Sequence, residues 1–142
     1  MNFLLDTNVV SEWVKLRPDA RVARWLAEAD EDSVYLSVIT FAEIRLGIEE
    51  MAAGARRQAL ASWLENDLLD RFEDRIIGVD LSIARAWGVL TARSTRTGVN
   101  LGVMDAFFAA TALAHGLTLV TRNIKHFANL GILLVNPWAA AE

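Results

Sequence analysis

Short apolar segments that alternate with stretches of helical periodicity limit this chain to a narrow set of folds. Five such segments are predicted to be buried strands, at residues 2–5, 34–37, 76–79, 117–120 and 132–135. Between them, apolar residues recur at helical spacing. They are Val22, Trp25, Leu26 and Ala29; Leu60, Trp63, Leu64 and Leu68; Ile83, Trp87 and Leu90; and the run from Met104 to His115. Strands that alternate with helices usually pair in parallel through right-handed crossovers, so the pattern predicts an α/β protein.

The length and composition predict one domain over residues 1–142. Hydrophobic residues make up 54% of the chain, enough for a substantial core. The absence of cysteine excludes disulfides and thiolate metal sites and agrees with a reducing cytoplasm, where we expect the protein to act. We expect no secretion signal, because no basic segment precedes Asp6. No apolar run reaches the ~18–20 residues that a membrane span needs.

Charge is distributed unevenly along the chain. The net charge of −4 excludes a uniformly basic nucleic-acid coat. Residues 1–80 hold 9 basic and 16 acidic residues, whereas residues 81–142 hold 5 basic and 2 acidic residues. Twelve of the 14 cations are arginine, whose forked guanidinium suits phosphate. An ordinary solvated surface explains the asymmetry, and a partly basic face beside an acidic site is the functional interpretation.

Asp6 follows the first predicted strand directly. Ligands of open α/β sheets bind at the carboxyl ends of the strands, where this residue is expected. The apolar segment before it should place its carboxylate close to apolar surroundings, where it needs hydrogen bonds, a cation or a proton. The alternative is a structural role as the N-cap of a helix that starts near Asn8.

Glu43 and Asp105 are the other two candidate acids. Thr40-x-x-Glu43 has the form of a capping box, which is a purely local structural device. Asp105 opens an apolar helix, so it is either a favourable first-turn charge or a buried acid that needs a cation. Three acids from distant segments that meet in one crevice would supply the oxygen ligands that Mg²⁺ and Mn²⁺ prefer.

Four segments, in order, resemble the motifs of PIN-domain nucleases. They are Leu4–Glu12, Ser37–Gly47, Asp105–Ala112 and Leu119–Phe127. The closing Val135-Asn-Pro-Trp138 is similar to the ending of the FitB-like branch of VapC toxins. The resemblance implies a PIN-like three-layer α/β/α fold with a central parallel sheet of about five strands. It also implies a Mg²⁺- or Mn²⁺-dependent endoribonuclease that acts on RNA, usually a homodimer held inactive by a cognate antitoxin.

Carried over by position, the resemblance makes Asp6, Glu43 and Asp105 the catalytic and metal-binding residues. Many family members have a fourth acid in the last motif, where this chain has Asn123 and His126. Asn123 still offers a carbonyl oxygen to a metal or to one of its waters. The substitution leaves open whether a second metal binds.

Polar and basic residues near these motifs are candidates for supporting roles. Ser11, Thr40 and Thr121 are expected to orient carboxylates or water, with backbone capping as the alternative. Candidate phosphate contacts are Arg45, Arg93, Arg96, Arg122 and Lys125, with a plain surface position as the alternative. Five tryptophans, at positions 13, 25, 63, 87 and 138, are candidate base-stacking platforms or partner contacts. Those at helical spacing are expected in core or interface packing. The resemblance further suggests an apolar groove between the early helices that would receive a partner helix.

Three other interpretations compete with a metal-dependent ribonuclease. A haloacid-dehalogenase-like phosphatase would need Asp-x-Asp after the first strand, but the chain has Asp6-Thr-Asn8. A catalytically weakened PIN-like binding module is suggested by the lost fourth acid. A fold in which the acids serve only as helix caps explains Glu43 well and Asp105 poorly.

Overall fold

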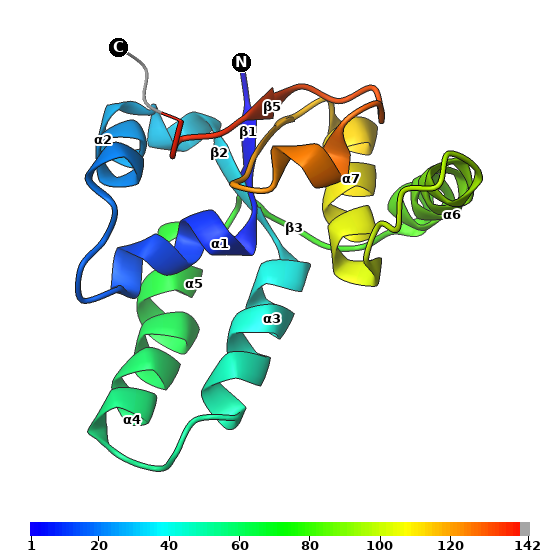
Figure 1. The fold of residues 1–142 in the computed structure, drawn as a ribbon. Helices are drawn as coiled ribbons and strands as arrows, with labels where there is room; N and C mark the ends of the chain where they lie inside the picture. Colours follow the sequence, from blue (N-terminus) through cyan, green and yellow to red (C-terminus); the bar gives the residue numbers. More distant parts are fainter. Residues whose placement is uncertain (140–142) are drawn as a thin grey trace.

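A five-stranded, entirely parallel sheet forms the centre of the molecule (Figure 1). The structure is a computed structural model and describes residues 1–139. The strand order is β3-β2-β1-β4-β5, so β1 lies in the middle. The strands are β1 (Phe3–Leu5), β2 (Val34–Ser37), β3 (Ile76–Ile77), β4 (Thr118–Val120) and β5 (Leu134–Val135). Each predicted strand is confirmed, although four of the five are shorter than the apolar segments that predicted them.

Successive residues of each strand face opposite sides of the sheet, which creates two separate cores. Leu4, Leu119 and Leu134 contribute to one core, together with side chains of α6 and α7. Their neighbours Leu5, Val120 and Val135 contribute to the other, with side chains of the N-terminal helices. The result is the three-layer α/β/α arrangement expected from the resemblance.

Helices cover both faces of the sheet (Figure 1). The first half of the chain contains α1 (Thr7–Val10), η1 (Ser11–Val14), α2 (Ala20–Glu28), η2 (Glu31–Ser33) and α3 (Val38–Glu49). The remainder contains α4 (Ala55–Ser62), η3 (Trp63–Leu68), α5 (Leu69–Arg71), α6 (Leu81–Arg96), α7 (Val103–His115) and η4 (Ile124–Phe127). None of the helices within residues 1–139 is both long and apolar enough to cross a membrane.

The helical predictions are confirmed with two local differences. The tryptophans at helical spacing pack as expected, with Trp25 and Trp63 against one core and Trp87 against the other. The apolar periodicity around Trp63 and Leu68 predicted one regular helix, but η3 is a π-helical segment between α4 and α5. In a π-helix the hydrogen bonds span five residues, so the spacing of apolar residues shifts locally.

The predicted capping box at Thr40 is wrong. Helix α3 begins three residues earlier, because Ser37 ends β2 in an extended conformation and its Oγ accepts a hydrogen bond from the Ile39 amide at 3.0 Å. Thr40 and Glu43 therefore lie inside α3, one turn apart on the same side. This placement leaves the Glu43 carboxylate available for contacts outside its own helix.

Candidate active site

Asp6 lies at the carboxyl edge of the sheet, between the end of β1 and the start of α1. Its backbone amide donates to the Val120 carbonyl of the neighbouring strand at 2.9 Å. The Thr7 amide donates to Asp6 Oδ1 and the Thr121 hydroxyl donates to Oδ2, both at 2.7 Å. The residue is 5% exposed. The predicted role of Asp6 as a helix N-cap is therefore confirmed for α1, and its buried carboxylate lies at the edge where ligands of open α/β sheets bind.

Glu43 joins this edge through Thr7. The Thr7 hydroxyl donates to Glu43 Oε1 at 2.6 Å and lies 3.2 Å from the hydroxyl of Thr40. Thr7 thus links two candidate acids, since its amide binds Asp6 and its hydroxyl binds Glu43. Ser11, another predicted supporting residue, lines the same groove as Thr7 and Glu43.

Asp105 lies in the first turn of α7, on the other side of β1 from Glu43. Its side chain is 27% exposed, so it is neither fully buried nor freely solvated. The apolar residues after it, Ala106 and Phe108, are buried in the core. His126 Nδ1 lies 3.3 Å from Asp105 Oδ2.

Asp6 feels the charges of the other two candidate acids. The pKa of Asp6 is raised to about 6, mainly by burial and also by the charges of Asp105 and Glu43. The Thr121 hydroxyl and the Thr7 amide oppose this rise, because their hydrogen bonds favour the ionised form. Asp6 has no cationic partner among the hydrogen bonds and ion pairs of residues 1–139. The site is therefore a concentration of negative charge in which Asp105 contacts His126, while Asp6 and Glu43 have no ion pair within the described chain.

The donor set suits a divalent cation that keeps part of its water shell. Within residues 1–139, no three acidic or histidine side chains lie close enough together to bind one ion directly. Mg²⁺ commonly binds through one or two carboxylates and retains several waters. Each Asp6 oxygen accepts one protein hydrogen bond and keeps a second lone pair for such an ion. The arrangement fits a hard cation, with water bridging to the more distant acids.

The other predicted supporting residues divide into two groups. Thr121 is fully buried, binds Asp6, and accepts a hydrogen bond from the Asn123 amide at 3.0 Å. The candidate cations lie farther out. Arg45 pairs with Glu49 at 3.2 Å and with Glu65 at 2.6 Å, and the Arg122 guanidinium lies 5.3 Å from the centre of the Trp138 ring. Arg93 lines a separate pocket between α6 and the segment after η4.

The sequence analysis missed Thr7, whose two hydrogen bonds connect Asp6 to Glu43. Its position directly after Asp6 was the available signal, because a hydroxyl at the first residue of a helix can reach a neighbouring segment. Nothing in the spacing of the motifs indicates which segment that is.

Comparison with known proteins agrees with this geometry. The sequence profile of the PIN domain matches residues 3–133. This chain belongs to the PIN-domain family. Relatives of this PIN domain include the plasmid stability protein StbB of Pseudomonas syringae pv. tomato, which is 41% identical over 96% of this chain and 99% of its own length. The VapC ribonuclease Y4jK of Sinorhizobium fredii is 38% identical over 97% of this chain and 99% of its own.

The PIN domain also resembles FitB in sequence and in structure. The toxin FitB of Neisseria gonorrhoeae is 36% identical over 95% of this chain and 97% of its own. The crystal structure of FitAcB from the same organism superposes with a TM-score of 0.91 and 36% identity, covering 97% of this chain and 99% of that one. The FitB-like resemblance predicted from the motifs is thus confirmed for the whole fold.

Proposed function

We propose that this PIN domain is a divalent-metal-dependent endoribonuclease, and that it acts in the cytoplasm as the toxin of a type II toxin–antitoxin pair. The observation that carries the proposal is the buried carboxylate of Asp6 at the carboxyl edge of the sheet, which has no ion pair among the described residues and whose pKa is raised in part by the charges of Glu43 and Asp105. Relatives that share nearly the whole chain are named as a VapC ribonuclease and as a toxin. The reaction would add water across an RNA phosphodiester and leave a 3′-hydroxyl and a 5′-phosphate.

Asp6, Asp105 and Glu43 are the residues that would hold Mg²⁺ or Mn²⁺, directly or through water. When bound, the ion lowers the pKa of a water molecule and stabilises the charge that develops on the phosphate. Thr121 and the Thr7 amide fix the Asp6 carboxylate, and the Thr7 hydroxyl fixes that of Glu43. Thr40, Ser11 and Asn123 would serve as further orienting residues. The carboxylates of Asp6 and Glu43 are thereby held in place before any ion arrives.

A groove that adjoins the acidic site is the proposed contact for a cognate antitoxin. It has a volume of about 350 Å³ and lies between η1, α3, α4 and η3. Apolar side chains of Ile44, Ile48 and Leu60 line it, and Thr7 and Glu43 lie at its edge. An amphipathic helix laid in this groove would bury its apolar face and reach the acidic site. We also propose a homodimer, which light scattering of the purified protein tests.

The second candidate function is a catalytically weakened PIN-like binding module. It is favoured by one observation, namely that Asn123 supplies a neutral, exposed side chain where many family members carry a fourth acid. The two functions predict opposite results in a cleavage assay.

The test is incubation of the partner-free protein with structured RNAs, in Mg²⁺, in Mn²⁺ and in EDTA. The ribonuclease predicts cleavage that EDTA abolishes and that Asp6→Asn and Asp105→Asn remove. Asp67→Asn is the matched control, because Asp67 is an exposed acid on η3. Equal degradation by wild type and Asp6→Asn would indicate a contaminating nuclease and contradict the proposal. RNA binding without cleavage under every metal condition would support the binding module instead.

A further inference from the structure

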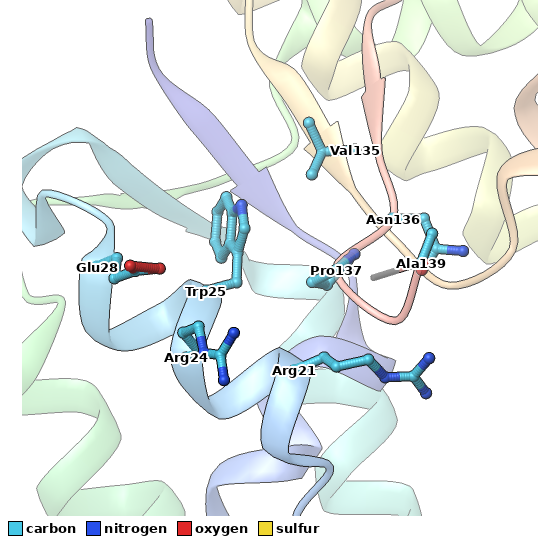
Figure 2. Close-up of a pocket in the computed structure, with 8 residues that line it drawn as sticks. All are labelled: Arg21, Arg24, Trp25, Glu28, Val135, Asn136, Pro137 and Ala139. Atoms are coloured by element: carbon cyan, nitrogen blue, oxygen red, sulfur yellow. The ribbon is translucent and has the colours of Figure 1, made fainter. Parts of the chain in front are cut away.

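A second concave surface lies between α2 and the segment that follows β5 (Figure 2). Its volume is about 280 Å³. One wall carries Arg21, Arg24, Trp25 and Glu28 of α2, and the other includes Asn136 and Pro137, with Val135 and Ala139 completing the lining. We call the surface lined by these residues the α2 pocket. None of the residues assigned above to the acidic site lines it.

The α2 pocket begins at the same sheet edge as the acidic site. Val120 and Val135 pair in register, and the Thr121 amide donates to the Val135 carbonyl at 2.9 Å. Asn136 therefore leaves the sheet beside Thr121, whose hydroxyl binds Asp6. Because β1, β4 and β5 are consecutive neighbours, the ends of β1 and β5 lie two strand spacings apart, roughly 10 Å. A single extended strand of RNA can therefore reach both places.

Contacts along this edge connect the two sites. Arg122 follows Thr121 directly and stacks over the ring of Trp138, which comes immediately after the Asn136–Pro137 wall. The Asn136 side-chain oxygen accepts a hydrogen bond from the Trp138 amide at 2.9 Å. This bond leaves the side-chain NH₂ of Asn136 available as a donor. The segments between Asp6 and the α2 pocket thus include the exposed cation of Arg122, the ring of Trp138 and the amide of Asn136.

The cationic charge of the α2 pocket comes mainly from Arg24. Arg21 is engaged by Asp19, with hydrogen bonds of 3.1 and 2.9 Å, and the guanidinium of Arg21 lowers the pKa of Asp19 to about 2. Arg24 makes no side-chain hydrogen bond or ion pair within residues 1–139, even with Glu28 one turn farther along α2. In Figure 2, Glu28 lies on the other side of Trp25 from Pro137, so the acid does not separate Arg24 from the wall after β5.

Trp25 supplies a fixed aromatic surface beside this cation. Its ring packs edge-on against Phe3 of β1, with centroids 5.1 Å apart. The indole remains partly exposed and lines the α2 pocket opposite Pro137. An aromatic ring held by the core, next to a guanidinium without an ion pair in residues 1–139, is a combination suited to binding single-stranded nucleic acid through stacking and phosphate contact.

We infer that the α2 pocket binds a nucleotide of the RNA substrate that flanks the cleaved bond. Arg24 contacts its phosphate, and Trp25 with Pro137 packs against its base or ribose. This inference rests on the proposed ribonuclease function, because it assigns the pocket and the acidic site to one RNA strand. The pocket then contributes to substrate binding and not to the chemical step.

The test measures binding and cleavage separately. Binding of a short fluorescein-labelled oligouridylate is followed by anisotropy in the Asp6→Asn background, over a range of salt concentrations. Arg24→Ala is expected to raise Kd about threefold to tenfold and to reduce the slope of log Kd against log salt by about 0.7, the loss of one phosphate contact to a single strand. Arg24→Glu should weaken binding further. In the otherwise wild-type enzyme, Arg24→Ala should raise KM and leave kcat nearly unchanged.

Arg85→Ala is the matched control, because Arg85 is an exposed arginine on α6 without an ion pair in the described chain. Trp25→Leu tests stacking, after thermal melting establishes that it folds. Equal Kd values and salt slopes for Arg24→Ala and Arg85→Ala would overturn the inference, whereas metal-dependent cleavage would still support the ribonuclease. RNA binding that depends on Arg24, without any cleavage, would support the α2 pocket as an RNA-binding site and contradict the ribonuclease. Arg24-dependent binding of oligoglutamate at the affinity of the RNA would assign the pocket to an acidic peptide and overturn the inference.

Discussion

At Asp6, the stability of the fold favours the protonated carboxyl, whereas the proposed chemistry needs the ionised carboxylate. Burial raises its pKa to about 6, above the value of 3.8 for an unperturbed aspartate, so the ionised form is less stable in the native state than in the unfolded chain. An acid with a raised native pKa contributes stability in full below its unfolded pKa. That contribution is lost as the pH rises through the native pKa. The form that a metal needs is therefore the form that destabilises the metal-free protein.

Asp6→Asn is expected to remove this pH dependence. In EDTA, the free energy of unfolding of wild type should fall relative to that of Asp6→Asn as the pH rises from 4 to 8, by about 1–3 kcal/mol in all, most steeply near pH 5, between the unfolded pKa of 3.8 and the native pKa of about 6. Urea unfolding at a series of pH values measures the difference, and contributions from other groups cancel because both proteins share them. Asp67→Asn should run parallel to wild type. Parallel curves for Asp6→Asn and wild type would contradict the prediction.

Thr7 is expected to position Glu43 for catalysis. Thr7→Val removes the 2.6 Å hydrogen bond to Glu43 but keeps the amide that binds Asp6. We expect kcat for RNA cleavage to fall about tenfold, the lower range for the loss of an orienting partner. Thr7→Ser keeps a hydroxyl and should restore most of the activity. A Thr7→Val enzyme with wild-type kcat would show that Glu43 needs no such support.

The sequence predicted the three candidate acids but not how their side chains are held. Asp6 was predicted from its place after a strand, where ligands of parallel sheets bind, and Glu43 and Asp105 were predicted from the motifs that contain them. The bond from Thr7 to Glu43 joins residues 36 positions apart and depends on the crossing of α1 and α3. Such a contact is set by tertiary packing, which local patterns do not encode.

In helix α3, the end of the preceding strand overrules a local sequence motif. Thr40-x-x-Glu43 matches a capping box in sequence, yet Ser37 is the N-cap. An N-cap needs extended backbone dihedrals, and Ser37 has them because it ends β2. Once the helix starts at Val38, Thr40 and Glu43 lie one turn apart and both meet Thr7. The strand end therefore decides whether Glu43 caps a helix or faces the site.

The turn after α7 allows a matched test of glycine conformation. Gly116 ends α7 with φ of 65°, a left-handed conformation, whereas Gly88 lies within α6. A Cβ would meet no atom within 4 Å at either position, so only backbone preference differs. Gly116→Ala should destabilise the protein by about 1–2 kcal/mol. Gly88→Ala should stabilise it by about 0.5–1 kcal/mol. Urea unfolding measures both, and changes of the same sign would contradict the argument.

At the scale of the whole molecule, some arginines form ion pairs with glutamates and others do not. In the acidic first half of the chain, Arg45, Arg57 and Arg71 pair with glutamates. Arg24 and Arg122 have no ion pair within residues 1–139, and both lie on the side of the sheet where β5 ends. The sequence showed how charge is distributed along the chain, but not which arginines remain without an ion pair. Which cations are uncompensated depends on the ion pairs that the fold creates.

A divalent cation is expected to stabilise the whole fold through the acidic site. A ligand that binds only the native state adds RT ln(1 + [L]/Kd), about 2.7 kcal/mol at a hundredfold excess over Kd. For a chain of this size, this corresponds to a rise in Tm of roughly 5–10 °C. Thermal melting in Mn²⁺ and in EDTA measures it without any RNA. Asp6→Asn should lose the shift, Asp105→Asn should reduce it, and Asp67→Asn should keep it. An equal shift in wild type and Asp6→Asn would mean that the metal binds elsewhere, and the acids at the sheet edge would then be caps and polar contacts without a shared ion.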